Sequence, residues 1–338
     1  MFPKVYIIIV NFNGWVDTLE CLESIYRIDY PNFQVIVVDN NSTNNSMDYI
    51  RAWAEGKGEN FIRLDNSFRK FIFPPIPKPI PYVVYTMEEA EKGGIFDLEK
   101  RFKNPLILIE SKRNGGFAFG NNLAIKYVLA KNDLDYVLLI NNDTIVEKDF
   151  LTKLVKASLK NEKAGIVGCK IYYYDRPNKI WFNGGKFNEW TGMAIHIKKE
   201  IPKECSEFNF ITGCCMLIKK EVLEKIGLFD ESYFMYVEDL DYSFRTIKNG
   251  YKLLVVHNSE IWHKVGSSNG GEVSEFSAYW YYRNSIKFRL KRLKKLKKFF
   301  AIVFILFMRI LVFFKLLFKR RFIIIKSLIR GTIDGFFG

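Results

Sequence analysis

Residues 4–14, KVYIIIVNFNG, are a β-branched run that ends in Asn11, Phe12, Asn13 and Gly14. This is the pattern of a buried strand that passes into a loop. Three later segments repeat it, each with polar residues after it: FQVIVVD (33–39), PLILIES (105–111) and YVLLIN (136–141). Because helical patterns separate these strands, the sequence predicts an α/β fold with a doubly wound, mostly parallel sheet. Ligands bind at the carboxyl ends of such strands, so the four polar strand ends predict a binding site.

The second half of the chain predicts strands at 164–174, 211–218 and 251–257, and a helix from near Glu238 to Gly250. Residues 66–104 interrupt the alternation. Their segment FPPIPKPIP (73–81) excludes a helix or a central strand, because each proline lacks a donor and fixes φ. We expect an inserted loop excursion there, either a plain surface insertion or a lid or partner-binding flap.

The composition is that of a globular protein. Of 338 residues, 49% are hydrophobic and 26% are charged, which excludes a disordered or collagen-like chain. The five cysteines are an odd number without paired spacing, and no secretory signal is apparent. We therefore expect a reducing, cytosolic setting.

The positive charge is concentrated at the C-terminal end. Residues 283–338 hold 16 Lys and Arg and one acid, a net of +15, which leaves −1 of the total +14 on residues 1–282. The same tail contains the apolar run FFAIVFILFMRILVFFKLLF (299–318). Basic residues beside an apolar run indicate an anionic membrane surface rather than a nucleic acid. We expect a domain at 1–282 and a membrane-associating helical tail at 283–338.

The run 299–318 is long enough to span a bilayer, since twenty helical residues rise roughly 30 Å. If 298–330 were one helix, six of its basic residues would share an arc of roughly 120°, which favours an amphipathic helix in the membrane plane. These are Lys298, Arg309, Lys315, Lys319, Lys326 and Arg330. The contact region would be 286–330. A spanning helix and a helix packed on the body are the alternatives.

Two acidic positions suggest chemistry. Asp143 follows the fourth strand, where a carboxylate can hold a divalent cation that bridges two phosphates; alternatively it caps a helix beginning near Val146. Glu238, Asp239 and Asp241 lie within four residues, and such a cluster normally serves a raised pKa or a cation. On a helix Asp239 and Asp241 point about 160° apart, so at most one of them joins Glu238 at a site. Arg245, one turn on, is placed to pair with Asp241, and the cluster is otherwise explained by the helix dipole.

Other polar motifs are weaker. Glycines in NGGFAFGNN (114–122) would let backbone amides approach a ligand at a helix start. His196 is expected at the surface, and His257 lies at the end of a strand. His263 lies just beyond that strand, near Gly266, Ser267 and Ser268, which would suit a phosphate.

Six segments together resemble the family-2 glycosyltransferases of the GT-A fold, especially their rhamnosyltransferase-like branch. In order along the chain they are VYIIIVNFNG, VVDNNSTN, RNGGFAFGNN, LLINNDT, ITGCCMLIKKEVLEKIGLFDESYFMYVEDLDYSFR and the region of His263. The match covers about 260 residues apart from the insertion. The resemblance implies a GT-A-type fold and transfer of one sugar, with inversion, from a dTDP- or UDP-sugar to a hydroxyl of a lipid-linked glycan.

The resemblance also implies roles for residues. Asp39 would bind the nucleotide base, with Asn11 and Asn13 beneath it, and Arg113 and Asn114 would contact the donor. Asn141, Asn142 and Asp143 occupy the place of the family's D-x-D motif, where Asn142 would face the donor and only the last acid remains. Asp143 and His263 would hold Mg²⁺ or Mn²⁺. Asp239 would act as general base with support from Glu238.

Composition excludes one related activity. The single glutamine, Gln34, lies in a strand, so the Q-x-x-R-W motif of processive polysaccharide synthases is absent. Two alternatives stay open: a polyprenyl-phosphate sugar synthase, and a non-catalytic membrane-bound scaffold. We expect the protein at the cytoplasmic face of the cell membrane, peripheral or monotopic, with one span as the alternative, and without a nucleic-acid partner.

Overall fold

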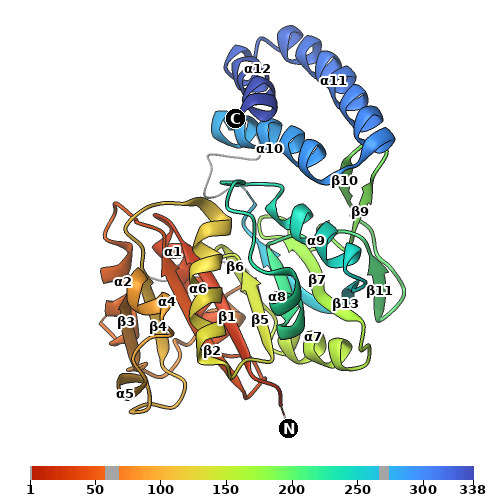
Figure 1. Ribbon diagram of the computed structural model, residues 1–338. Coiled ribbons are helices and arrows are strands. Elements are labelled where there is room, and N and C mark those ends of the chain that lie inside the picture. Colours follow the sequence, from red (N-terminus) through yellow and green to blue (C-terminus); the bar gives the residue numbers. More distant parts are fainter. Residues whose placement is uncertain (1, 58–67, 266–273) are drawn as a thin grey trace.

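The computed structural model describes residues 2–57, 68–265 and 274–338, and its centre is a large mixed sheet (Figure 1). The nine strands of its main path follow one another in the order β11 (Cys205–Phe208), β13 (Lys252–His263), β7 (Ala164–Tyr173), β12 (Cys215–Lys219), β5 (Tyr136–Ile140), β1 (Val5–Asn11), β2 (Phe33–Asp39), β4 (Leu106–Glu110) and β3 (Tyr82–Thr86).

The sheet is mostly parallel, as predicted. Strands β3, β4, β2, β1 and β5 pair in parallel, and β13 is parallel to β7, whereas β12 runs antiparallel between β5 and β7. All five residues of β5 and the first five of β1 are buried, which requires helices on both faces of the sheet. The expectation of a doubly wound α/β fold is therefore confirmed.

Short strands and helices complete the body. Strand β6 (Thr144–Val146) pairs with β13, β8 (Ile180–Phe182) pairs with β7, and β9 (Gly185–Asn188) forms a separate two-stranded sheet with β10 (Met193–His196). The helices of the body are α1 (Trp15–Ile25), α2 (Ser46–Ala54), α3 (Arg69–Ile72), α4 (Met87–Glu91), α5 (Phe96–Glu99), α6 (Gly116–Lys131), α7 (Phe150–Leu159), α8 (Lys220–Ile226) and α9 (Glu238–Lys248).

The described part of the predicted insertion, residues 68–104, is not a plain loop excursion. The proline-rich stretch 73–81 has no helix or strand, as expected, but β3 follows it directly and pairs in parallel with β4 at the edge of the sheet. Buried Glu23 fastens the stretch: its carboxylate accepts hydrogen bonds from the Ile76 amide at 2.9 Å and from Lys78 Nζ at 2.7 Å. The prediction missed β3 because prolines precede it, yet a strand with one unpaired edge tolerates such neighbours.

Three helices form the C-terminal part: α10 (Glu275–Arg292), α11 (Lys295–Phe318) and α12 (Phe322–Phe337). Figure 1 shows them together at the end of the molecule opposite the N-terminus. The chain turns between α11 and α12, so the single helix considered for 298–330 is wrong. Its predicted polar arc fails as well, because Arg309 is buried.

Helix α10 belongs to the body. Its Phe288 and the following Leu293 join a second hydrophobic core with Leu240 and Phe244 of α9 and Phe187 of β9. Helix α12 packs closely on α10 through two glycines. A Cβ on Gly331 would lie 2.6 Å from the Tyr279 carbonyl oxygen, and one on Gly335 would lie 2.6 Å from that of Arg283. Small residues at this spacing allow two helix backbones to approach.

Candidate active site

The first group of predicted site residues lies at the ends of β1 and β2. The parallel register places Asn11 beside Asp39, and Asn11 Nδ2 donates to Asp39 Oδ1 at 2.8 Å. The Ser42 hydroxyl donates to the same oxygen at 2.6 Å, and the Ser42 amide donates to Asp39 Oδ2 at 3.0 Å. These contacts hold the Asp39 carboxylate in one orientation.

Asn13 and Asn142 connect this group to neighbouring loops. Asn13 is left-handed, with a φ of 54°, and its side-chain oxygen accepts the Thr43 amide at 2.7 Å. Asn142 Nδ2 donates to Thr18 Oγ1 at 3.0 Å, and Thr18 Oγ1 donates to Asn11 Oδ1 at 2.9 Å. Asn142 therefore contacts the start of α1, and the Thr18 hydroxyl connects it to Asn11.

Three amides of the glycine-rich segment at the start of α6, which we expected to approach a ligand, are paired within the protein. The amides of Gly115, Gly116 and Phe117 donate instead to Asn40 Oδ1 at 3.4 Å, Asn114 Oδ1 at 3.0 Å and the Phe234 carbonyl at 2.9 Å. Gly116 has a φ of 85°, and a Cβ there would lie 1.9 Å from the Phe234 carbonyl oxygen. The glycine serves the close approach of two chain segments.

Arg113 and Asn114 flank the same loop. Arg113 is exposed, and its guanidinium lies over the Phe119 ring, 4.6 Å from the centroid. Asn114 accepts a hydrogen bond from Asn40 Nδ2 at 3.0 Å, which ties this loop to the end of β2. The structure thus brings Asn114 to the Asp39 group and leaves Arg113 at the surface.

Asp143 and His263 are brought together by β6 and β13. Strand β13 extends six residues beyond the predicted end, with a register shift between Val256 and Glu260, so His263 is its last residue and pairs with Thr144. His263 Nε2 lies 3.1 Å from Asp143 Oδ1 and 3.3 Å from Asn141 Nδ2. The alternative that Asp143 caps a helix near Val146 is wrong, because β6 occupies that segment and α7 begins at Phe150.

This pair has the donor chemistry of a partial metal site. Two ligands bound at right angles at about 2.1 Å lie about 3 Å apart, which the Asp143–His263 separation matches. Among the residues the structure describes, no cluster of three or more His, Cys, Asp or Glu could hold a metal ion by itself. Two protein ligands suffice where phosphate oxygens supply the others, so these residues fit Mg²⁺ or Mn²⁺ carried with a diphosphate.

Glu238 and Asp239 are the first two residues of α9. The Gly213 amide donates to Asp239 Oδ2 at 2.9 Å, and the Leu240 amide donates to Asp239 Oδ1 at 2.8 Å. Burial raises the pKa of Asp239 above its ordinary value although these amides oppose the shift. Burial, rather than repulsion by the neighbouring acids, is thus the main cause of the raised pKa of Asp239. Burial also raises the pKa of Glu238 well above its usual value, and there the Asp239 charge adds to it.

Asp241 is structural, as the position of Arg245 suggested. It is fully buried, Arg245 Nε donates to it at 2.8 Å, and Arg292 of α10 pairs with it from the other side. Its charge is thereby neutralised inside the protein.

Adjacent residues before β12 join the acids to the Asp143–His263 pair. Gly213 binds Asp239, while the carbonyl of the next residue, Cys214, accepts the Asn141 amide at 3.0 Å. Asn141 in turn contacts His263. The candidate base and the candidate metal ligands therefore share one rim of the sheet.

The other histidines are packing residues. His196, expected at the surface, is only partly exposed: it packs edge-on against Trp181 and Phe182, and burial lowers its pKa to about 4. His257 is buried, with Nδ1 2.7 Å from Asn183 Oδ1. The predicted phosphate-facing segment 266–268 lies outside the described residues.

The sequence did not predict the contacts of two further residues near the site. Lys264 follows His263 and binds Asp17 and Glu20 of α1, each at 2.6 Å. Asn284 of α10 donates to the carbonyls of Met235 and Tyr236, just before Glu238. Neither contact could have been found from spacing in the sequence. Lys264 lies 244 or more positions from its partners, and Asn284 lies 48 or 49 positions from its partners.

Comparison with known proteins identifies the family of the chain. A family model described as "Glycosyltransferase like family 2" matches residues 79–282, and a second one, "Glycosyl transferase family 2", matches residues 6–71. The chain belongs to glycosyltransferase family 2.

The curated relatives of this family-2 glycosyltransferase include rhamnosyltransferases. The rhamnosyltransferase WbbL of Escherichia coli is 26% identical over 192 residues, which cover 52% of this chain and 71% of the relative. The dTDP-rhamnosyl transferase RfbF of Shigella flexneri is 26% identical, covering 53% of this chain and 57% of its own. The N-acetylglucosaminyl-diphospho-decaprenol L-rhamnosyltransferase of Mycobacterium tuberculosis is 27% identical, covering 40% and 49%. The chain thus spans about half the length of the last two.

Solved structures confirm the GT-A type of fold. The mannosyltransferase PcManGT from Pyrobaculum calidifontis, solved with GDP-Man and Mn²⁺, has a TM-score of 0.55 at 15% identity, with 98% of this chain and 74% of that chain covered. GalNAc-T7, solved with UDP, GalNAc and Mn²⁺, has a TM-score of 0.53 at 14% identity, with 85% and 47% covered.

Proposed function

We propose that this glycosyltransferase moves one sugar from a dTDP- or UDP-sugar to a hydroxyl of a lipid-linked glycan, with inversion. Sugar transfer in polysaccharide biosynthesis follows from the family and its relatives. The finer assignment is supported by the names of two relatives. One name includes dTDP-rhamnosyl, a nucleotide-sugar donor, and the other includes N-acetylglucosaminyl-diphospho-decaprenol, a lipid-linked acceptor.

The observation that carries the proposal is the placement of Asp239. Its carboxylate is held by the Gly213 and Leu240 amides, and its pKa is raised by burial. A general base works best with a pKa near the operating pH, so the shift is in the useful direction. Asp239 takes the proton of the acceptor hydroxyl as the new glycosidic bond forms and the diphosphate leaves from the opposite face.

The other site residues bind and orient the donor. Asp39, held by Asn11 and Ser42, accepts hydrogen bonds from the nucleotide base. Asp143 and His263 would hold Mg²⁺ or Mn²⁺, and a cation there neutralises charge on the leaving diphosphate.

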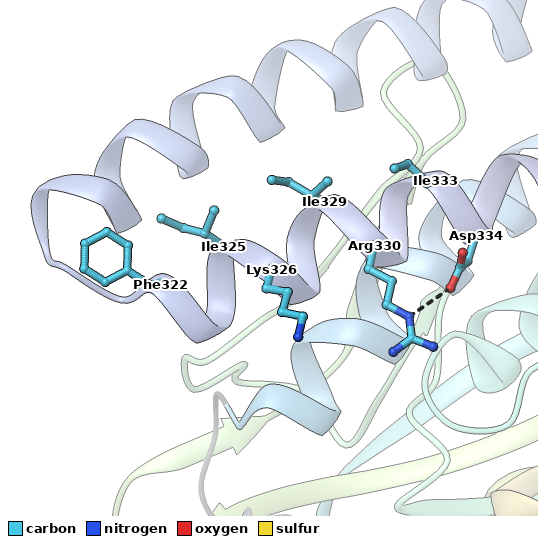
Figure 2. A pocket seen from close by; sticks show the side chains of 7 residues that line it. All are labelled: Phe322, Ile325, Lys326, Ile329, Arg330, Ile333 and Asp334. Carbon is cyan, nitrogen blue, oxygen red and sulfur yellow. Dashed lines mark ion pairs between the residues drawn. The ribbon is translucent and has the colours of Figure 1, made fainter.

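We further propose that α11 and α12 lie on an anionic membrane, at its cytoplasmic face. Among the described helices, α11 is the one long and apolar enough to cross a bilayer, with a mean hydropathy of 2.6. Its buried residues Ala301, Ile305 and Arg309 occupy one narrow face, and most of its other apolar side chains are exposed. Exposed apolar residues also continue along α12, from Phe322 to Phe337, and Figure 2 shows three of them, Phe322, Ile329 and Ile333. Such a surface, flanked by Lys and Arg, suits the boundary of headgroups and acyl chains.

The contacts of Arg309 favour the in-plane orientation over a span. Arg309 lies in the middle of α11, where its guanidinium donates to Ser285 Oγ of α10 at 2.8 Å and to Thr332 Oγ1 of α12 at 2.5 Å. If α11 crossed the bilayer, α10 and its polar groups would be drawn to the bilayer centre as well, at a high cost in desolvation. The α11–α12 hairpin therefore lies in one leaflet.

The test of the transfer proposal is Asp239→Asn. We expect sugar transfer to fall by at least about a hundredfold, since general-base catalysis contributes about 10²–10⁴. Binding of UDP or dTDP with Mn²⁺, measured by calorimetry, should stay within about twofold of the wild type, which is about 0.4 kcal/mol. Asp97→Asn, at an exposed acid on α5, is the control. An active Asp239→Asn enzyme would indicate a polyprenyl-phosphate sugar synthase, whose phosphate acceptor needs no strong base.

A further inference from the structure

The turn that leads into Glu238 and Asp239 has an unfavourable backbone. Tyr236 has a φ of 66° and Val237 a φ of 77°, so two consecutive residues with side chains are left-handed. Valine is branched at Cβ and is among the residues that adopt this conformation least readily. A residue strained in this way persists only where the surroundings hold it.

Asn284 of α10 holds this turn. Its side chain is fully buried, and Nδ2 donates to the Met235 carbonyl at 2.8 Å and to the Tyr236 carbonyl at 3.1 Å. The Asn284 side-chain oxygen accepts from Arg283 Nη1 at 2.9 Å, and the same Nη1 donates to the Ser232 carbonyl at 3.2 Å. The amide is thus oriented by a neighbour that also binds the segment before α9.

The C-terminal residue of α10 also contacts α9. Arg292 pairs with the buried Asp241, one turn beyond Glu238. Helix α10 therefore contacts the start of α9 from both sides of the acids, and an error in the turn would be transmitted directly to the position of Asp239.

We propose that Asn284 is a positioning residue for sugar transfer, which sets the position of the Asp239 carboxylate by holding the turn at Met235–Val237. This inference rests on the proposed role of Asp239 as general base. Asn284 is too deeply buried to bind the substrate itself, so it acts through the backbone it holds.

The inference also gives α10 a second task. Ser285, the next residue, binds Arg309 of the proposed membrane hairpin. Neighbouring residues of one helix thus contact the catalytic turn and the hairpin.

The experiment compares Asn284→Ala with Asn122→Ala in the full chain. Asn122 is a matched control, because it is also a buried asparagine that donates to a backbone carbonyl before α9. Its Nδ2 donates at 2.9 Å to the carbonyl of Phe229, which precedes the turn at Met235–Val237 and is not part of it. Both variants should lose similar stability. We expect Asn284→Ala to lower kcat by about 10–100-fold, since a displacement of about 1 Å costs about a hundredfold. The donor KM and the nucleotide affinity should stay within about twofold, a difference of about 0.4 kcal/mol.

Asn284→Asp keeps the size of the side chain but removes both donors. It should lower kcat at least as much as Asn284→Ala, and it keeps the inference testable if the alanine variant does not fold. A loss of kcat that Asn122→Ala reproduces, or wild-type kcat in either Asn284 variant, would overturn the inference. Asp239→Asn is measured alongside: if that variant is active, the proposed function fails, whereas if only the Asn284 variants are active, the positioning role alone fails.

Discussion

Removal of the C-terminal helices should have opposite outcomes at two cut sites that are nine residues apart. Deletion of 295–338 removes α11 and α12 but keeps α10. Deletion of 286–338, the cut suggested by the start of the expected contact region 286–330, divides α10 and removes its C-terminal part. We expect the first protein to fold, bind nucleotide and leave the membrane, and the second to unfold.

The magnitude follows from what the second cut removes. Phe288 and Leu293 belong to the second core and are each at most 2% exposed. Burial of such a side chain stabilises a protein by about 1.5–3 kcal/mol, so the two contribute about 3–6 kcal/mol. The cut also removes Arg292 from the buried Asp241, and loss of one partner of a buried pair costs about 3–5 kcal/mol. Arg245 remains on Asp241, which places that cost at the lower end. The combined loss is comparable to the whole stability of about 5–15 kcal/mol.

Both proteins are purified in mild detergent and compared by thermal unfolding, calorimetry with UDP and dTDP, and flotation with vesicles that contain anionic lipid. The expected results for the 295–338 deletion are one cooperative transition, wild-type nucleotide affinity and no flotation. If the 286–338 deletion melted within a few degrees of it, α10 would not be part of the body. Flotation of the 295–338 deletion would refute the membrane role of α11 and α12.

Three smaller changes test other contacts. Glu238→Gln removes a carboxyl whose pKa is raised in the folded protein, so the wild type should lose stability as pH rises from 4.5, the ordinary pKa of a glutamate, through the folded pKa. The melting temperature of the variant should decline less steeply over this range, and parallel curves for the two proteins would contradict this. Asp143→Ala should weaken Mn²⁺-dependent nucleotide binding at least about tenfold and leave metal-free binding unchanged; an unaltered Mn²⁺ dependence in calorimetry would remove Asp143 from the metal site. Gly331→Leu should lower the free energy of unfolding by about 1–3 kcal/mol by forcing α12 from α10, whereas Ile333→Leu, at an exposed position, should not.

Local patterns were enough to predict most strands of the main sheet. The strands at β1, β2, β4 and β5 read as unbroken apolar runs because each is buried on both faces, and this signal is independent of distant contacts. β3 was missed because YVVYT follows a proline-rich stretch and gains its stability from pairing with β4. The turn between α11 and α12 was missed because Lys319, Arg320 and Arg321 are compatible with a helix, and only the packing of α12 on α10 ends α11.

The candidate site was predictable as a set of residues but not as a set of contacts. Asp39, Asp143, Glu238 and Asp239 stand out because they follow strands or begin a helix, which spacing reveals. His263 was placed near a phosphate loop, yet its contact with Asp143 depends on the extension of β13 and its pairing with β6. The amide of Gly213 on Asp239 required two segments 26 positions apart to meet, and nothing in either segment announces the other.

Charge suggested a boundary after residue 282, whereas the contacts favour another position. Up to Leu293 the chain fills most of the second core, holds the turn before Glu238 and neutralises Asp241. Beyond it, α11 adds Ala301 to that core, and its buried residues are confined to one face. We therefore propose that the catalytic body ends at Leu293 and that the hairpin is 295–338. The net charge of a segment reflects the partners of its surface, while a domain boundary depends on which side chains share a core.

Arg289 shows the difference: it counts toward the charge of the basic tail, yet it is 2% exposed and donates to the Gly192 carbonyl at 2.6 Å. Charge reversal at exposed Lys319 or Arg320 should therefore weaken membrane binding without altering stability, whereas Arg289→Glu should unfold the body before any effect on membranes can be measured.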